Sequence, residues 1–375
     1  MQDNIQVLIS IDVEPDERLL SVTKPEPWRG QEYLFQRVDG IREALEKHTR
    51  RPVNFGWNFR LDPQIEKSCG DAVWPLHAFE NGIASLVRAG DEFGVHPHAH
   101  RWDARQRTWF TDYGDQSWVE HCVRLSLDAY ESYFGKPCKM FRFGGCWIND
   151  ETLDLIDRLG LEFDLTVEPG HSADNRAPPW EMVYGEYPDT RGAPTMPYRR
   201  SGAGNGHVDG GANCGLWMVP VSTAILRFDR GGVSPAESKI LETDRNTLIR
   251  KKLKGASQKT IQIARMRRLM ARFRWSRIAY VRFGRFCLDL LTTGPQTRTV
   301  VLNMLHDHAQ YACVFDHALA ESGYRFVHTV LRSGSLAFPY ARANFTRNIE
   351  FLLNHRYADR FVVSTPDRLS KHWDG

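Results

Sequence analysis

The chain has 375 residues, of which 42% are hydrophobic and 11% aromatic; this is enough for a buried core and too much for a disordered protein. Its formal net charge is only +3, and no run of about 18 apolar residues is present that could span a membrane. The N-terminus lacks the pattern of a secretory signal, and the seven scattered cysteines form no C-x-x-C pair. These features predict a cytoplasmic protein with reduced thiols.

Short apolar runs alternate with helical patterns along the chain, and each run is bounded by turn residues. Strands are expected at 5–14, 52–59, 91–100, 138–145, 161–168, 215–222, 299–308 and 360–365. Helices are expected at 38–50, 77–90, 117–135, 151–160 and 341–355. Repeated strand–helix alternation favours a parallel sheet, and about seven such units suit a closed α/β barrel.

Polar residues follow the predicted strands at the point where each strand ends. They are Asp12 and Glu14 after the first strand, three histidines after the third, Arg142 after the fourth, Asp164 in the fifth and His306 in a later one. In parallel barrels the chemistry sits at the carboxyl ends of the strands. We therefore expect these side chains to share one mouth of the barrel.

The stretch "FGVHPHAHRW" (93–102) places histidines at alternating positions, His96, His98 and His100. Asp12 and Glu14 lie on one face of a strand because their spacing is two residues. His96 and His100 are four apart, which places them on one face in either an extended or a helical backbone. Two imidazoles and one carboxylate can hold a catalytic divalent metal with open positions, and we expect zinc. A solvated loop, with carboxylates that cap the next helix, is the alternative for each residue alone.

The motifs "ISIDVEPDE", "DEFGVHPHAH", "FRFGG", "FDLTVEPG" and "LNMLHDH" occur in the order found in NodB-homology polysaccharide deacetylases, carbohydrate esterase family four, which the chain resembles over about residues 5–310. The resemblance implies a single domain, 1–375, with a distorted (β/α)7-type barrel. It also implies metal-dependent removal of an N- or O-acyl group.

The resemblance further implies a role for each motif residue. Asp12 would be the general base, and Glu14, His96 and His100 would be the metal ligands. Arg142 would keep the base ionised, His306 would be the general acid, and Asp164 would orient and charge His306.

The sequence departs from the family pattern in several places. The usual adjacent Asp-Asp is Asp-Val-Glu here, and "RFGG" lacks the usual proline of the arginine motif. His98 is an additional histidine, which we expect to face the substrate or to support the ligands, although it could replace a neighbour as ligand. His308 is a rival to His306 as the acid. Three residues are expected to contact the substrate: His98, Arg60, for which an ion pair is the alternative, and Trp147, for which core packing is the alternative.

Residues 245–288 contain fourteen Lys and Arg and no Asp or Glu, so the rest of the chain carries 3 − 14 = −11. Apolar residues recur among these charges at roughly helical spacing. We expect a basic helical insertion, 225–295, before the last barrel strand, in peripheral contact with an anionic membrane face. An acidic glycan or an oligomer contact are the rivals, and no recognised nucleic-acid-binding module accompanies the charge.

These features predict a metal-dependent deacetylase of an acylated sugar or glycan precursor, attached to lipid or free, in cell-surface polysaccharide synthesis. One alternative is a hydrolase of the same fold that acts on a non-sugar amide. Another is a metal-binding or carbohydrate-binding module without turnover, although mere binding would not need Asp12, Arg142 and His306 together. A non-haem iron oxygenase would also use two histidines and a carboxylate, but its common His-x-Asp/Glu spacing is absent.

Overall fold

The computed structural model describes residues 4–23, 27–173, 181–200, 215–228, 296–323 and 325–373. These fall into two compact units, Met1–Asp174 with Tyr184–Ala224 and Val301–Gly375, and Asn175–Val183 with Ile225–Val300. The second unit contains few described residues. The predicted basic stretch 245–288, and most of the predicted insertion 225–295, lie outside the described residues, so the membrane contact stays a prediction.

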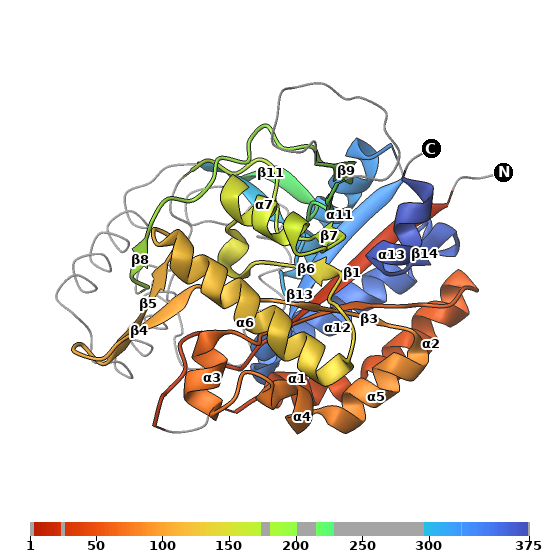
Figure 1. Cartoon of the computed structure of the whole chain (residues 1–375). Helices are drawn as coiled ribbons and strands as arrows, with labels where there is room; N and C mark the ends of the chain where they lie inside the picture. Colours follow the sequence, from red (N-terminus) through yellow and green to blue (C-terminus); the bar gives the residue numbers. More distant parts are fainter. Residues whose placement is uncertain are drawn as a thin grey trace, which may run out of the picture. The chain divides into compact units, whose positions relative to one another are not determined.

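The first unit is built on a nine-stranded, mainly parallel sheet, in the order β13-β1-β2-β3-β6-β7-β10-β9, with β14 also paired to β1 (Figure 1). Its strands are β1 (Ile5–Val13), β2 (Gly56–Phe59), β3 (Glu92–Val95), β6 (Met140–Phe141), β7 (Phe163–Asp164), β9 (Tyr198–Arg199), β10 (Trp217–Met218), β13 (Phe326–Arg332) and β14 (Phe361–Val363). Only β9 runs antiparallel to its neighbour. The sheet curls, because backbone hydrogen bonds from Ser222 to His328 and from Met304 to Val330 join the segments after β10 and β12 to β13. The predicted distorted (β/α) barrel is confirmed.

Five further strands form the two smaller described sheets: β4 (His100–Asp103), β5 (Thr108–Asp112), β8 (Val183–Tyr184), β11 (Thr223–Phe228) and β12 (Gln296–Val301). β4 and β5 form an antiparallel hairpin. β11 and β12 pair with each other.

The described helices are α1 (Arg29–Phe35), α2 (Val38–Thr49), α3 (Pro63–Cys69), α4 (Trp74–Ala78), α5 (Glu80–Ala89), α6 (Gln116–Phe134), α7 (Asp150–Arg158), α11 (His308–Glu321), α12 (Pro339–Leu353) and α13 (Pro366–Leu369). In Figure 1, α6 lies in front of the strands, and it packs on β3 and α7. Asp115 and Asn149 cap α6 and α7 by accepting hydrogen bonds from backbone N–H groups of the first turn. The described part of the chain contains no helix long and apolar enough to cross a membrane.

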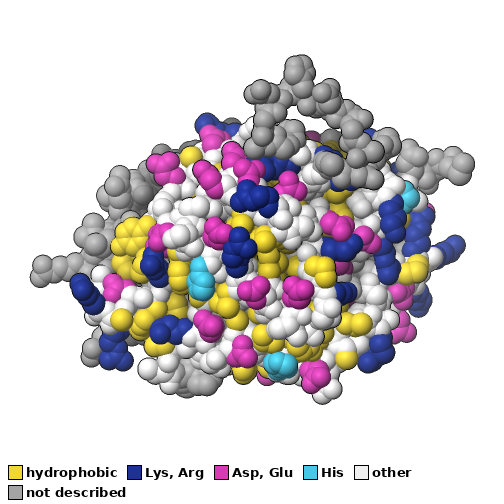
Figure 2. All heavy atoms as spheres, in the orientation of Figure 1, with side chains coloured by type: hydrophobic (Ala, Val, Ile, Leu, Met, Phe, Trp, Pro, Cys, Tyr) yellow, Lys and Arg dark blue, Asp and Glu magenta, His cyan; other side chains and the backbone are white. Residues whose placement is uncertain are grey.

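The core of the barrel is apolar, while its helical exterior is mixed in charge. Leu8, Met140, Phe163, Leu165 and Val219 belong to one buried cluster. On the face shown in Figure 2, acidic and basic side chains are interspersed among the described residues. Buried polar residues occur along the strands, as in the Ser10–His328 pair, and at the strand ends, where the candidate site lies.

Candidate metal and catalytic site

Three potential ligand atoms converge where β1 and β3 end. The Glu14 Oε1 atom lies 2.9 Å from His96 Nε2 and 3.1 Å from His98 Nε2, and the two Nε2 atoms are 3.2 Å apart. All three residues are buried. A tetrahedral zinc site with bonds of about 2.1 Å would hold its ligand atoms about 3.4 Å apart, so this triangle has the size that such an ion needs.

The ring orientation of His96 also suits a bound cation. His96 Nδ1 lies 2.8 Å from the Arg142 carbonyl oxygen, which can only accept a hydrogen bond, so Nδ1 carries a proton. In the neutral imidazole, Nε2 then presents a lone pair to a carboxylate oxygen 2.9 Å away. Two lone pairs repel at this distance unless a metal ion or a proton lies between them. A backbone carbonyl that fixes the second nitrogen is also the usual arrangement behind a metal-bound histidine.

Glu14 is held as a carboxylate. Burial raises its pKa, but Arg332, His96 and His98 outweigh this and bring the pKa well below its ordinary value. Arg332 forms an ion pair with Oε2, which leaves Oε1 for the histidines. The backbone N–H of Glu14 also donates to Ser333 Oγ at 3.1 Å, so both ends of the residue are fixed.

His98 belongs to this group, although the sequence singled out His96 and His100. Burial lowers the pKa of His98 well below its ordinary value, with the charge of Arg60 as a further cause, so the ring is neutral and able to bind a metal. Its Nδ1 atom is buried without a hydrogen-bond partner among the described residues, which costs free energy that a bond at Nε2 could offset.

His100 lies behind His98 and outside the group of converging ligand atoms. Its Nδ1 is 2.9 Å from Thr111 Oγ1, across the β4–β5 hairpin. Its ring stacks on that of His98 with 4.9 Å between centroids. Burial, followed by the charge of His98, lowers the pKa of His100 well below its ordinary value, so it is a neutral ring that supports its neighbour. The structure therefore differs from the expected ligand set in one histidine.

Gly144, in the altered arginine motif "RFGG", leaves the space that the His98 ring occupies beside Glu14. A Cβ atom at position 144 would lie 2.2–2.3 Å from three atoms of the His98 ring. No side chain fits there unless His98 moves. The glycine that stands in "RFGG" and the additional histidine are thus two parts of one local structure.

Asp62 is a buried support that the sequence analysis missed. It accepts hydrogen bonds from the backbone N–H groups of Gln64, Ile65 and His98, and it forms an ion pair with Arg60 at 2.7 Å. Both side chains of the ion pair are fully buried. The Asp-Pro step before α3 is the sequence signal of such a helix cap. Arg60 forms the ion pair that was its alternative, and its contact with an anionic substrate group stays a prediction.

We expect Asp62→Asn to reduce the free energy of unfolding by about 3–5 kcal/mol, because the buried charge of Arg60 would lose its partner. Chemical denaturation measures this loss. The matched change Asp103→Asn removes a half-buried carboxylate that accepts, among the described residues, only from backbone N–H groups, and it should cost less than about 1 kcal/mol. Equal losses in the two variants would contradict the supporting role of Asp62.

Asp12 lies beside the metal-ligand candidates and is paired with Arg142. Its Oδ2 atom is 3.9 Å from His96 Nε2, and Arg142 Nε is 3.1 Å from its Oδ1. The guanidinium of Arg142 is buried, and it also reaches Glu168 at 3.5 Å and the carbonyl oxygen of Leu165. The structure thus brings together Asp12, Glu14, His96 and Arg142, all of which the sequence placed at strand ends.

No hydrogen bond or ion pair joins His306 and Asp164 in the described part of the chain. The Asp164 carboxylate accepts from Thr166 Oγ1 and N, and burial raises its pKa to about 7. Burial lowers the pKa of His306 to about 4. No carboxylate of the described residues is bonded to the His306 ring, and the role of Asp164 in charging His306 stays a prediction.

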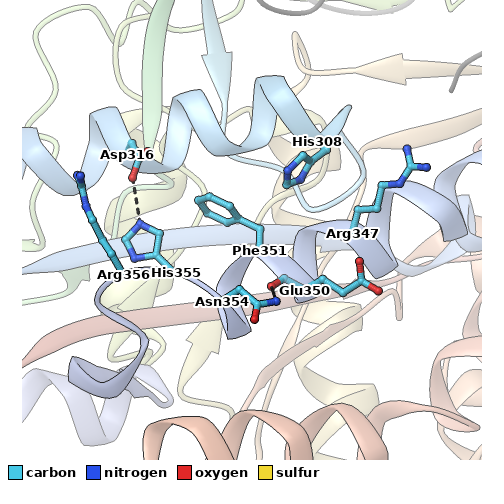
Figure 3. A pocket seen from close by; sticks show the side chains of 8 residues that line it. All are labelled: His308, Asp316, Arg347, Glu350, Phe351, Asn354, His355 and Arg356. Carbon is cyan, nitrogen blue, oxygen red and sulfur yellow. Dashed lines mark hydrogen bonds and ion pairs between the residues drawn. The ribbon is translucent and has the colours of Figure 1, made fainter. Parts of the chain in front are cut away.

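Two further residues that the sequence analysis considered for the site, His308 and Trp147, pack against other parts of the protein. His308, the rival acid, begins α11 and lines a surface pocket between α11 and α12 with Phe351 and Arg347 (Figure 3). Trp147 is 2% exposed, stacks on Tyr113 at 4.6 Å and donates to the Glu186 carbonyl oxygen. Its ring thus has the core packing that was its alternative, and stacking of Trp147 on a sugar stays a prediction.

No protein-family model matches the chain, and no curated protein matches it. Among solved structures, the chain is similar to a candidate polysaccharide deacetylase from Mycobacterium smegmatis (TM-score 0.46, 11% identity, 99% of this chain and 91% of that chain). It is also similar to a probable polysaccharide deacetylase from Pseudomonas aeruginosa PAO1 (0.43, 12%, 98% and 90%). A 4-alpha-glucanotransferase from Thermococcus litoralis matches as well (0.38, 11%, 99% and 41%). At these identities and TM-scores the similarity concerns the fold alone.

Proposed function

We propose that this protein is a metal-dependent hydrolase that removes an N- or O-acyl group from a sugar or glycan precursor, in cell-surface polysaccharide synthesis. The observation that supports the proposal is the convergence of Glu14, His96 and His98 beside a carboxylate, Asp12, that is not needed as a ligand. A binding site alone would not require this second carboxylate and its buried arginine.

The converging residues would hold a divalent ion, which we propose to be zinc. Such an ion supplies a polarised acyl carbonyl and a bound water with a pKa near 7. Asp12 would accept the proton of that water as general base, because it lies next to the cluster and is kept in place by Arg142. Arg142 binds the base Asp12 through its side chain and orients His96 through its backbone carbonyl oxygen. One residue therefore positions both the general base and a metal-ligand candidate.

We propose His306 as the proton donor to the leaving group. Asn303, three residues earlier, pairs with Val330 of β13, and Arg332 of the same strand pairs with Asp12. His306 therefore follows its strand at the same edge of the barrel. Because burial lowers its pKa to about 4, it would have to take up the proton during the reaction rather than hold it beforehand.

The test is metal analysis of the purified protein by mass spectrometry, followed by acetate release from acetylated sugars and from non-sugar acetamides. We expect about one divalent ion per chain, and acetate released from sugars with loss of activity in a chelator and recovery on adding metal. Release from non-sugar amides alone would replace the proposed substrate class. A metal-loaded protein that releases acetate from neither panel would overturn the proposed reaction.

A further inference from the structure

Arg332 occupies an unusual position for a cation, directly beside the proposed metal carboxylate. It is the last residue of β13, and the parallel register pairs it with Asp12 of β1. Its Nε atom forms an ion pair with Glu14 Oε2, while Oε1 of the same carboxylate faces His96 and His98. Arg332 therefore leaves one oxygen of Glu14 available as a ligand.

The remaining guanidinium nitrogens of Arg332 are not used within the described structure. Nη1 and Nη2 have no hydrogen bond or ion pair to a described residue, and only Nε has a partner. The Arg332 side chain is 31% exposed, whereas that of Glu14 is 3% exposed. The end of the guanidinium therefore opens outwards next to the buried cluster.

Holding Glu14 does not by itself account for an arginine at this place. A neutral donor would hold one carboxylate oxygen, as the Ser333 hydroxyl does for the Glu14 carbonyl oxygen at 3.5 Å. A permanent positive charge beside a cation site opposes binding of the ion. A second cation, Arg18, lies near enough to lower the pKa of His100, after burial and the charges of His98 and Arg60. An anion bound at this rim would be attracted by the charge of the Arg332 guanidinium, whose outer nitrogens have no partner among the described residues.

We propose that Arg332 binds an anionic substituent of the substrate, so that the acylated sugar is an acidic one. A carboxylate fits best, because the two outer nitrogens of a guanidinium match its two oxygens in a planar, bidentate contact. Arg332 is then a specificity-determining residue, and its distance from the ligand cluster fixes where the acidic group sits relative to the acyl group. This inference rests on the proposed function for the reaction, but not for the binding of the anion.

The experiment compares an acetylated uronic acid with its methyl ester, which differ only in the charge of one substituent. We expect the wild-type protein to prefer the acid by about 10- to 100-fold in kcat/KM, the size of a charge-assisted hydrogen bond. Arg332→Gln should bring this ratio to about 1, and Arg332→Lys should keep part of it. Metal content is measured for each variant, and the ester serves as internal reference for any general loss of activity.

The matched control is Arg325→Gln, an exposed arginine just before the same strand, which should leave the acid-to-ester ratio unchanged. Titration calorimetry with glucuronate and its methyl ester tests anion binding without turnover, so it distinguishes a failed inference from a failed reaction. A wild-type ratio of about 1, or a preference that survives in Arg332→Gln, would overturn the inference. Inhibition by acetate that depends on Arg332, without any preference for the acid, would assign Arg332 to the product instead and also overturn it.

Discussion

His98→Asn is expected to weaken metal binding by more than about 100-fold, whereas His100→Asn should weaken it by less than about tenfold. Asparagine keeps a polar atom near the position of the histidine Nδ1 and removes Nε2. In His98 the lost atom faces Glu14 at 3.1 Å, and in His100 the retained atom can still bond Thr111. Loss of a direct ligand should exceed the roughly 10–100-fold cost of changing a residue behind the ligands. Metal retained after dialysis against graded chelator, measured by mass spectrometry, gives both affinities.

Gly144→Ala provides a control that leaves every ligand atom in the chain. The added Cβ would displace the His98 ring, so we expect metal loss similar to that of His98→Asn. Gly40→Ala, in α2, adds a Cβ with no heavy atom within 4 Å, and it should bind metal normally. If His100→Asn empties the site while His98→Asn and Gly144→Ala retain the ion, the ligand pair is His96 and His100, as the resemblance to the family implied.

Much of the fold could be predicted because the periodic segments are long and clearly bounded. The expected helices at 117–135 and 151–160 correspond to α6 and α7, with Asn149 as the cap of α7. β13, which pairs with β1 at one end of the strand order, was missed, although Ser322-Gly323 before it and Ser333-Gly334 after it are turn signals. Arg332 was missed with it.

The site could be predicted to the level of strand ends but not of individual rings. The end of a parallel strand fixes which edge of the barrel a residue occupies, and this placed Asp12, Glu14 and Arg142 correctly. Between β3 and β4 the backbone at residues 96–99 is neither helix nor strand, so neither periodicity decides which histidine faces Glu14. That choice depends on Asp62 and Gly144, which contact His98 from elsewhere in the chain.

The same limit applies to the residues expected at the substrate. Arg60 and Trp147 lie near strand ends, but their side chains are enclosed by an ion pair and a stacked ring respectively. Strand position alone does not distinguish a side chain that faces the mouth from one that supports it. Partners far away in the sequence make this distinction, and they are visible only in the folded chain.

Asp12 and its partner Arg142 allow the proton-transfer step to be tested separately from metal binding. Asp12 lies 3.9 Å from His96 Nε2, beyond the group of atoms that could hold the ion, and its partner is the Arg142 guanidinium. Its carboxylate is therefore available to take a proton without giving up a ligand. Replacing the Asp12 carboxylate by an amide, as in Asp12→Asn, preserves the shape of the side chain but removes the basic group.

We expect Asp12→Asn to retain the metal ion and to lose about 10²–10⁴-fold in kcat, the usual contribution of a positioned general base. The measurement pairs metal analysis with acetate release under saturating substrate, and circular dichroism checks that the variant folds. Asp16→Asn is a matched control on the same segment. Asp16 pairs with Arg29 and the Gly30 N–H rather than with the cluster, so this change should lower stability more than turnover. If Asp12→Asn loses the ion together with activity, Asp12 is a ligand. If it retains both, another residue must accept the proton, and the structure offers Glu168, on the other side of Arg142, as the next carboxylate.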